Sequence, residues 1–394
     1  MKQSAHGTGM TVSILSLSLL TVMAGAAVAP ALSVIQAHFS NSSQLFVQMI
    51  ISVPALFIVV TNFIFPKLCE IFGAKTLVLI GLLFYTVGGC AAGLFDNIFA
   101  VLIMRVFVGI GVGILMPMST GLLSFYFSPE KQAGLMGYSS AMNQMGGVIA
   151  TLLSGILANI SWRVSFLVYL MGLISLILCL ISLPNDKITQ EKHAGEESTK
   201  KGTAGVFRAN IIYIVAMFLL MSIFFIYPAN FAMETAAEGI IPQNYIAVIM
   251  ASMDFIAFLG GLLFVSAKKV LGPNTKFLAP VCFLAGYLLL AVAGGWAGTL
   301  IGSVFIGFAN GAGIPFIMTE ASIKAGKAAA TTVMPFISAA LYLAQFVSPV
   351  LMSLVRMLSG EGILHLPYWF AVVLAVLFVL WSFLITAEKV ENKK

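Results

Sequence analysis

Charged residues are what this sequence has least of. Only 9% of its 394 residues are charged, whereas 60% are hydrophobic and the mean hydropathy is +1.05. A soluble globular chain carries about 25% charged residues. So few charges could not cover the surface of a soluble protein of this size, and most of the surface is therefore expected to face the lipid bilayer.

Motifs for catalysis and nucleotide binding are also absent. The sequence has no G-x-x-x-x-G-K-[ST] phosphate loop, which argues against ATP as an energy source, and no serine in a G-x-S-x-G elbow. Its four histidines, His6, His38, His193 and His365, lack metal-ligand spacing. A membrane enzyme, the competing class, would need acids or histidines clustered at one interface. The sequence thus predicts neither an enzyme nor a bound metal or cofactor.

Cysteine pairs and basic tracts are missing too. Cys69, Cys90, Cys179 and Cys282 lie in or beside apolar segments without paired spacing, which excludes a disulfide scaffold and a zinc site. The formal charge of +6 could indicate nucleic-acid binding. However, the basic residues stand singly or in small clusters between apolar runs, as membrane loops do, so no nucleic-acid partner is expected.

Long apolar runs dominate what is present. A helix needs about twenty apolar residues to cross a bilayer, because hydrocarbon offers no partner to free backbone groups. Twelve runs have this character: 11–36, 45–66, 76–95, 98–123, 132–158, 163–183, 211–233, 244–265, 277–295, 298–320, 329–353 and 366–386. Another run follows the first at once, so the first is interpreted as a spanning helix and not as a cleaved signal peptide.

The longest polar stretch, residues 184–210, divides the runs six and six. It is charged and poor in aliphatic residues, which predicts a flexible linker, with a short helix on the membrane surface as the alternative. We therefore expect an all-α membrane protein with twelve transmembrane helices in two pseudo-symmetric six-helix bundles, residues 1–183 and 211–394. We expect this protein to be a monomer.

Lysine and arginine predict the topology. With both termini and the linker placed on one side, that side holds all of the 20 basic residues except Arg105, Arg163 and Arg356. The positive-inside rule assigns this side to the cytoplasm. An odd number of helices would remove the asymmetry, so the charge pattern independently supports twelve helices. The predicted location is the cell (inner) membrane, with both termini cytoplasmic.

The two halves repeat one another. Four pairs lie 198 residues apart: Pro30 and Pro228, Gly109 and Gly307, Gly113 and Gly311, and Pro117 and Pro315. Gly73 and Gly272 match with a slip of one residue. A series of prolines and glycines at nearly constant offset indicates an internal duplication. Parallel six-helix repeats with a substrate site between them are a known transporter plan.

The segment between the second and third runs reads FPKLCEIFGAK, from Phe65 to Lys75. It resembles the signature loop of the major facilitator superfamily, and the resemblance extends over essentially the whole chain. Gly73 and Lys75 match that loop, Glu70 stands at its usual aspartate, and Pro66 and Ala74 depart from it. The resemblance implies that Glu70, Gly73 and Lys75 belong to a cytoplasmic gate. The alternative for Glu70 is a solvated loop acid.

The fourth run contains Arg105-Val-Phe-Val-Gly109, which resembles the intramembrane arginine motif of that superfamily. An arginine inside a membrane helix costs about 2.5–3.5 kcal/mol or more unless it is paired or wetted. Arg105 shares a helix face with Gly109 and Gly113, which favours a packed functional position. Snorkelling of the side chain to the outer interface is the alternative.

The fifth run carries GGVIATLLSG, from Gly146 to Gly155, and is followed by SWRVSF. Both strings resemble the twelve-helix drug:proton antiporter-like group, although Ala150 and Thr151 stand where that group usually has a Gly-Pro pair. The resemblance implies efflux by a secondary antiporter.

Polar residues inside the spanning runs are candidates for a cavity lining, because they are costly unless they face protein or water. In the fifth run Ser140, Gln144, Thr151 and Ser154 share one narrow face. The substrate-binding candidates are Gln144, Tyr227, Asn230, Asn310, Tyr342 and Gln345. The alternative is that such residues join helices by packing and hydrogen bonds.

Asp254 is the acid best placed for proton coupling. It lies midway along the eighth run among small residues, where burial favours its neutral form and an approaching cation favours its ionised form. Arg105 is its candidate partner, and a permanent structural salt bridge between the two is the alternative. Glu320, one turn from Lys324, is expected to form a helix-end ion pair. Glu234 and Glu238 are expected at the outer mouth.

These observations favour a secondary transporter that works by alternating access. A sensor without transport would be expected to add a soluble domain. Within transport, proton-coupled efflux of a small amphipathic compound is the favoured function. The alternative is proton- or sodium-coupled uptake of a small polar metabolite or organic anion, because an intramembrane arginine attracts anions whereas an acid attracts cations.

Overall fold

The computed structural model describes residues 8–187, 199–239, 241–293, 295–359, 363 and 365–385. All regular structure within these residues is helical. In this part of the chain, ten helical stretches are long and apolar enough to cross a membrane, and the apolar helix Leu366–Ser382 is shorter. The expectation of an all-α membrane protein is therefore confirmed.

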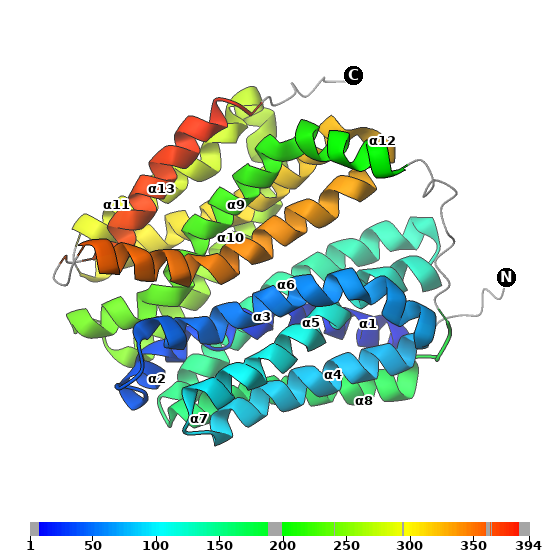
Figure 1. Ribbon diagram of the computed structural model, residues 1–394, viewed down its shortest axis with the longest axis horizontal. Coiled ribbons are helices and arrows are strands. Elements are labelled where there is room, and N and C mark those ends of the chain that lie inside the picture. The colour runs from blue at the N-terminus through cyan, green and yellow to red at the C-terminus, as the bar shows by residue number, and fades with distance from the viewer. Residues whose placement is uncertain are drawn as a thin grey trace. The chain divides into compact units, whose positions relative to one another are not determined.

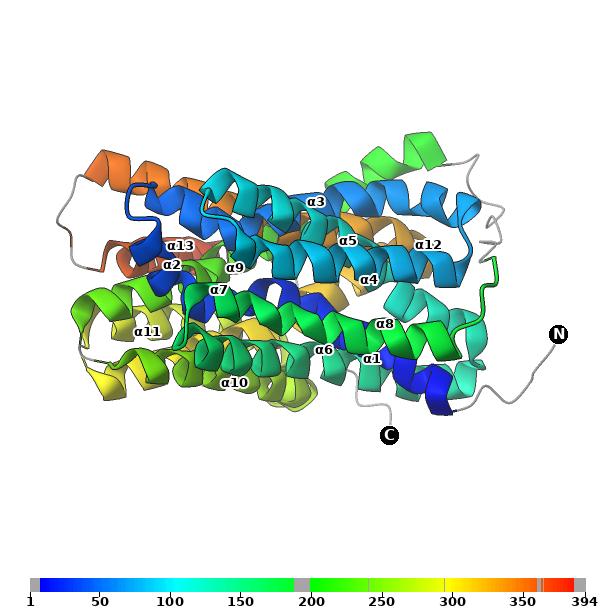
Figure 2. The same cartoon turned by 90° about the horizontal axis from the view of Figure 1, so that it is seen from below.

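The described residues form two compact units, which divide between Gln190 and Glu191. The first unit contains α1 (Thr8–Ala26), η1 (Ala29–Ala31), α2 (Leu32–His38), α3 (Gln44–Ile71), α4 (Ala74–Ala91), η2 (Ala92–Leu94), α5 (Ile98–Tyr126), α6 (Pro129–Ala158), α7 (Trp162–Ser165), η3 (Phe166–Leu170) and α8 (Met171–Ser182). Residues Pro242–Ala251 also group with it. Figures 1 and 2 both show α4 and α8 of this unit side by side.

The second unit contains the rest of the chain. Its elements are α9 (Thr199–Glu238), α10 (Gln243–Leu271) from Ser252 onward, η5 (Gly272–Phe277), α11 (Leu278–Val292), α12 (Trp296–Ser359) and α13 (Leu366–Ser382). Within it, α9 packs on both α12 and α13.

Each of the twelve predicted runs coincides, to within a few residues, with helical structure. The predicted break between the tenth and eleventh runs is not seen, because α12 is one helix of 64 residues. A straight helix of this length would measure about 96 Å, roughly three times the hydrocarbon thickness of a bilayer. Its apolar parts, Trp296–Ala325 and Val333–Ser359, are each long enough to span.

The predicted linker is partly helical. Residues 199–210, assigned to the flexible stretch 184–210, form the first turns of α9. Strong helix formers such as Lys and Ala in this segment favour that outcome over a coil. Residues 188–198 of the predicted linker lie outside the described residues.

Glycines bring helices together inside each unit. A Cβ added to Gly109 of α5 would lie 2.5 Å from the Pro54 carbonyl oxygen of α3, and one on Gly111 would lie 2.7 Å from the Gly81 oxygen of α4. In the second unit, a Cβ added to Gly307 or Gly311 of α12 would likewise collide with the carbonyl oxygen of Met253 or Ala257 of α10. No larger residue fits these positions without moving a backbone.

The contacts themselves repeat. Gly109 and Gly307 lie 198 residues apart, but their partners Pro54 and Met253 lie 199 apart. The same slip separates Gly73 from Gly272. The internal duplication predicted from the sequence is thus reproduced in the packing of α5 on α3 and of α12 on α10.

Candidate functional site

Arg105 is completely buried in the first unit. Its Nε donates to the Ile50 carbonyl at 2.7 Å, its Nη1 to the Tyr169 hydroxyl at 2.6 Å and its Nη2 to the Ala24 carbonyl at 2.5 Å. The guanidinium carbon also lies 5.1 Å from the centre of the Tyr169 ring. Snorkelling to the outer interface, the alternative for Arg105, is therefore wrong, because the side chain turns into the protein.

Sequence explains why these acceptors are available. Pro54 has no backbone N–H, so the carbonyl of Ile50 lacks its usual partner in α3. Ala24 lies in the last turn of α1, where carbonyls have no helical partner. The Tyr169 hydroxyl donates to the same Ala24 oxygen at 2.7 Å. The positive charge is thus held by carbonyl dipoles and an aromatic face that join α1, α3, α5 and η3.

A second polar contact joins α1 to α6. The hydroxyls of Ser18 and Ser139 lie 2.6 Å apart, and the Asn143 amide donates to the Thr21 hydroxyl at 2.7 Å. Gln144, the predicted ligand on the neighbouring position, is half-buried. The sequence analysis missed Asn143, although a second amide beside Gln144 was a visible signal.

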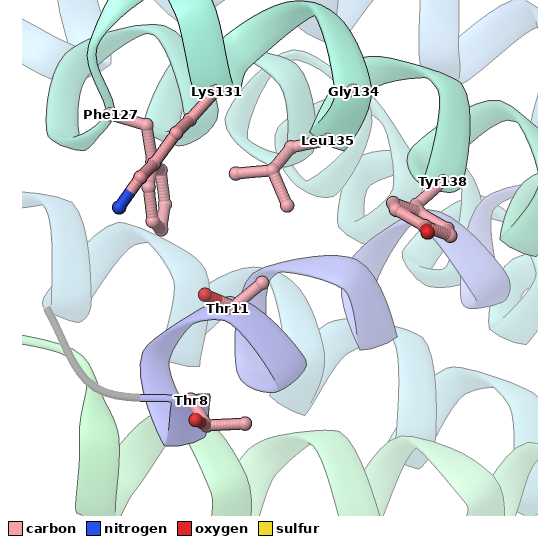
Figure 3. Close-up of a pocket in the computed structure, with 7 residues that line it drawn as sticks. All are labelled: Thr8, Thr11, Phe127, Lys131, Gly134, Leu135 and Tyr138. Carbon is pink, nitrogen blue, oxygen red and sulfur yellow. The ribbon is translucent and has the colours of Figure 1, made fainter.

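A cavity of about 400 Å³ opens between the first turns of α1 and α6. It is lined by Thr8, Thr11, Phe127, Lys131, Gly134, Leu135 and Tyr138. Figure 3 shows the Leu135 side chain pointing from α6 toward α1, with Tyr138 farther along α6. A Cβ at Gly134, or at Gly137 one turn away, would meet nothing within 4 Å. Glycine costs a helix about 0.8–1.0 kcal/mol relative to alanine, and here no close packing offsets it.

The predicted gate residues lie where α4 meets the chain after α8. The Ala74 N–H donates to the Asp186 carbonyl at 2.8 Å, and the Thr76 N–H to the Asn185 side chain at 3.2 Å. These bonds satisfy free amides at the start of α4. In the opposite direction, Nζ of Lys75 donates a hydrogen bond to the Leu180 carbonyl in α8 at 2.6 Å.

Gly73 and Glu70 differ in their surroundings. A Cβ at Gly73 would collide with the Asn185 amide, so a larger residue would displace the side chain that accepts from Thr76. Glu70 is exposed in the last turn of α3. The contact between the loop and residues 180–186 lies wholly inside the first unit.

In the second unit, Tyr227 and Asp254 come together. Tyr227 is fully buried, stacks on Phe231 with ring centres 4.3 Å apart, and shares a 2.7 Å hydrogen bond with Ser303. Asp254 of α10 is half-buried and within electrostatic range of the Tyr227 hydroxyl. Ser303 is the repeat partner of Arg105, 198 residues away. The first unit therefore has a cation at this position of the repeat, whereas the second has a hydroxyl pair with an acid nearby.

Asn230, one turn beyond Tyr227, is engaged on both ends of its amide. Its Nδ2 donates to the Ile226 carbonyl at 2.9 Å, and its Oδ1 accepts from Arg356 at 3.0 Å. Arg356 also lies 3.6 Å from Glu234. The sequence analysis had placed Glu234 at an outer mouth but had missed Arg356 as its partner.

The other predicted ligands lie in α12. Asn310 and Gln345 are buried, each with 8% of its surface exposed, and Tyr342 is half-buried. The side-chain oxygen of Asn310 has no hydrogen-bond partner among the described residues. A buried amide oxygen in this state is a candidate for contact with a ligand or a water molecule.

Glu320 pairs with a different lysine from the one expected. Its Oε1 lies 2.6 Å from Nζ of Lys268 in α10, and its side chain is 1% exposed. Lys324, the predicted partner on the same helix, is exposed. The close approach of α10 to α12 at their glycines explains the outcome, because it brings a lysine from the neighbouring helix to the acid.

Comparison with known families supports this architecture. The Major Facilitator Superfamily model matches residues 14–349. The chain is 26% identical over 262 residues to Multidrug resistance protein 3 of Bacillus subtilis, covering 61% of the chain and 51% of that protein. Over 153 residues it is 24% identical to Riboflavin transporter RibZ of Clostridioides difficile, covering 38% and 33%. The chain thus spans about half or less of the curated relatives named here.

Solved structures share the fold at low sequence identity. The nucleoside transporter NupG has a TM-score of 0.77 at 14% identity, covering 95% of this chain and 98% of that one. An inward-facing bacterial homologue of the lysosomal transporter Spinster has a TM-score of 0.74 at 14% identity, covering 97% of both chains. Because the family model covers most of the sequence, this multi-pass membrane protein belongs to the Major Facilitator Superfamily.

Proposed function

We propose that this transporter exports a small amphipathic compound across the cell membrane in exchange for protons, with both termini in the cytoplasm. The observation that carries the proposal is Asp254, an acid in an apolar helix, half-buried beside the Tyr227–Ser303 hydroxyl pair. Curated relatives named for multidrug resistance and quinolone resistance support export. The charge pattern of the loops supports the orientation.

Asp254 can serve as the coupling group because its surroundings change the free energy of its two protonation states. In a place poor in water the neutral acid is favoured, and a cationic substrate or a nearby hydroxyl donor favours the carboxylate. A proton and a cationic substrate would then compete for one site. Binding of either one shifts the transporter only by its difference in affinity for the two access states.

The packing inside each unit suits movement by alternating access. Glycine contacts hold α5 on α3 and α12 on α10 at backbone distance, which makes each pair a stiff body. The contact of Gly73 and Lys75 with residues 180–186 closes the loop after α3 onto its own unit. In this proposal Gly73 and Lys75 make the cytoplasmic edge of the first unit stiff. The residues that contact substrate are Gln144, Asn310, Tyr342 and Gln345.

A second candidate is coupled uptake of a small polar metabolite or organic anion. It is favoured by the cavity between α1 and α6, because Lys131 lines it together with the hydroxyls of Thr8 and Thr11. An ammonium group and hydroxyl donors attract an anionic group, whereas Phe127 and Leu135 suit an apolar body.

Transport into reconstituted vesicles tests the first proposal. Wild type and Asp254→Asn would be compared for flux of amphipathic cations and organic anions under an imposed proton gradient. Loss of gradient-driven flux in the variant, with Asp96→Asn unaffected, is the expected result. Asp96 is a suitable control because it is an exposed acid between η2 and α5 whose ion-pair partners, Arg163 and His38, also belong to the first unit. Equal gradient-driven flux in wild type and Asp254→Asn would refute the role of Asp254, and flux driven only by sodium would refute proton coupling.

A further inference from the structure

One face of α9 carries a series of polar residues that ends in two acids. Tyr227, Asn230, Glu234 and Glu238 follow at intervals of three, four and four residues, so they lie on the same side of the helix. Tyr227 and Asn230 are buried, and the side chains of Glu234 and Glu238 are 21% and 19% exposed. The exposure of this face therefore rises toward the end of the helix.

Both acids have a basic partner from another segment. Arg356, in the last turn of α12, lies 3.6 Å from Glu234. His365, at the start of α13, lies 3.2 Å from Glu238 through Nδ1. These four residues are called the outer cluster below. Their side chains are 12–26% exposed, which leaves each of them some contact with solvent.

The outer cluster combines two carboxyl groups with the guanidinium of Arg356 and the imidazole of His365. His365 is also held in the left-handed backbone region, with φ of 57°, which a non-glycine residue adopts only when its surroundings stabilise it. The backbone thus holds the imidazole of His365 in place beside Glu238.

Asn230 lets Glu234 change its charge without leaving Arg356 unpartnered. The guanidinium donates to the Asn230 oxygen at 3.0 Å, which is shorter than its distance to Glu234. If Glu234 takes up a proton, Arg356 keeps this neutral acceptor. An ion pair without such a second partner would strand a half-buried cation, which is strongly unfavourable.

Buried tyrosines connect the outer cluster to Asp254. The Tyr368 ring stacks on His365 with centres 5.8 Å apart and lies 6.3 Å from the ring of Tyr287. The Tyr368 hydroxyl is within electrostatic range of Glu234, Glu238, Tyr227 and Tyr287, and Tyr227 is in turn within range of Asp254. Seven residues of α9, about 10 Å of helix, separate Tyr227 from Glu234.

We propose that Glu234 is the residue through which the coupling proton is exchanged with water on the outer side of the membrane, opposite the linker of residues 184–210. In this step a proton from that water binds a carboxylate oxygen of Glu234, and the Arg356 pair opens while the bond to Asn230 stays. The proton later leaves Glu234 and binds the Asp254 carboxylate, and no other bond changes. Arg356 and His365 act as positioning residues that set the charge around Glu234. The inference rests on the proposed proton coupling.

The test measures how transport depends on the pH of the outer side in vesicles of known orientation. Glu234→Gln is expected to flatten this dependence or to move its midpoint by about one pH unit or more. Substrate exchange at equal pH on both sides should continue, because Asp254 is intact. Glu234→Asp should restore the wild-type profile, and Asp96→Asn, which changes an exposed acid of the first unit, should leave it unchanged.

The possible outcomes distinguish failure of the role of Glu234 from failure of the proposed function. If Asp254→Asn abolishes proton-driven flux but Glu234→Gln keeps the wild-type profile, the exchange role of Glu234 is wrong and the proposed function stands. If wild type itself shows no proton-driven flux, the proposed function fails first. Loss of both driven flux and equal-pH exchange in Glu234→Gln, with substrate binding and the unfolding temperature also lowered, would show a structural role and overturn the inference.

Discussion

Arg105 donates a 2.7 Å hydrogen bond to the carbonyl of Ile50, the one carbonyl in α3 that Pro54 leaves without a helical partner. The same proline lies against Gly109, where an added Cβ would be 2.5 Å from its oxygen. One turn of α5 therefore supplies both the donor and the space in which Pro54 of α3 packs. A charged residue that composition alone marks as costly is here part of the packing of the unit.

Removing the acceptor on Tyr169 should destabilise the first unit. Tyr169→Phe leaves an Arg105 N–H without its partner and the Ala24 oxygen with one donor fewer, so a loss of about 1–3 kcal/mol in unfolding free energy is expected. Thermal unfolding in detergent micelles measures it. Tyr138→Phe, at a tyrosine that is 64% exposed, is the matched control and should be neutral. An unchanged midpoint for Tyr169→Phe would show that the hydroxyl contributes nothing.

Two glycine-to-alanine changes should have opposite signs. Gly109→Ala forces a Cβ onto the Pro54 carbonyl, and overpacking of this kind costs about 1–3 kcal/mol. Gly137→Ala meets open space and should stabilise the protein by up to about 1 kcal/mol through helix propensity. The same unfolding measurement compares them. Destabilisation by Gly137→Ala would mean that another part of the protein approaches this face.

The buried pair between Lys268 and Glu320 should be sensitive to removal of one partner only. Glu320→Gln strands a lysine whose side chain is 13% exposed, and a loss of about 3 kcal/mol is expected. Replacing both residues by methionine should recover much of the loss, because well-packed apolar side chains often substitute for a buried pair. Lys269→Met, at an exposed neighbour, is the control. A double variant no better than Glu320→Gln would contradict this account.

The sequence was sufficient for features that follow from local pattern. Apolar run length located the helices, and the constant offset of glycines and prolines revealed the repeat, since both are read along one chain. It was insufficient for partners that only tertiary packing brings together. Arg356 and Asn230 are 126 residues apart, and Lys268 and Glu320 are 52 apart. No periodicity links such pairs, because their meeting depends on how helices cross.

Some of the helix boundaries predicted from the sequence were wrong for a related reason. Residues 321–328 and 199–210 are polar enough to be taken for loops, yet both continue helices. Polarity indicates where a chain leaves the hydrocarbon, whereas the end of a helix depends on caps and breakers. Neither segment contains a proline, and in both places the helix extends past the apolar run.

Lys131 offers the sharpest separation between the two candidate substrate classes. Its ammonium group lines the cavity between α1 and α6 beside two threonine hydroxyls. If the substrate is an organic anion, Lys131→Gln should weaken its apparent affinity by about fivefold or less, the range expected for one solvent-exposed charge pair. If the substrate is an amphipathic cation, the same change should leave its affinity equal or improve it. Concentration series of flux in vesicles measure both cases, with Lys67→Gln in the last turns of α3 as the control. A fall in affinity for cations and anions alike would assign Lys131 to the shape of the cavity instead of its charge, because loss of charge alone cannot weaken the binding of both.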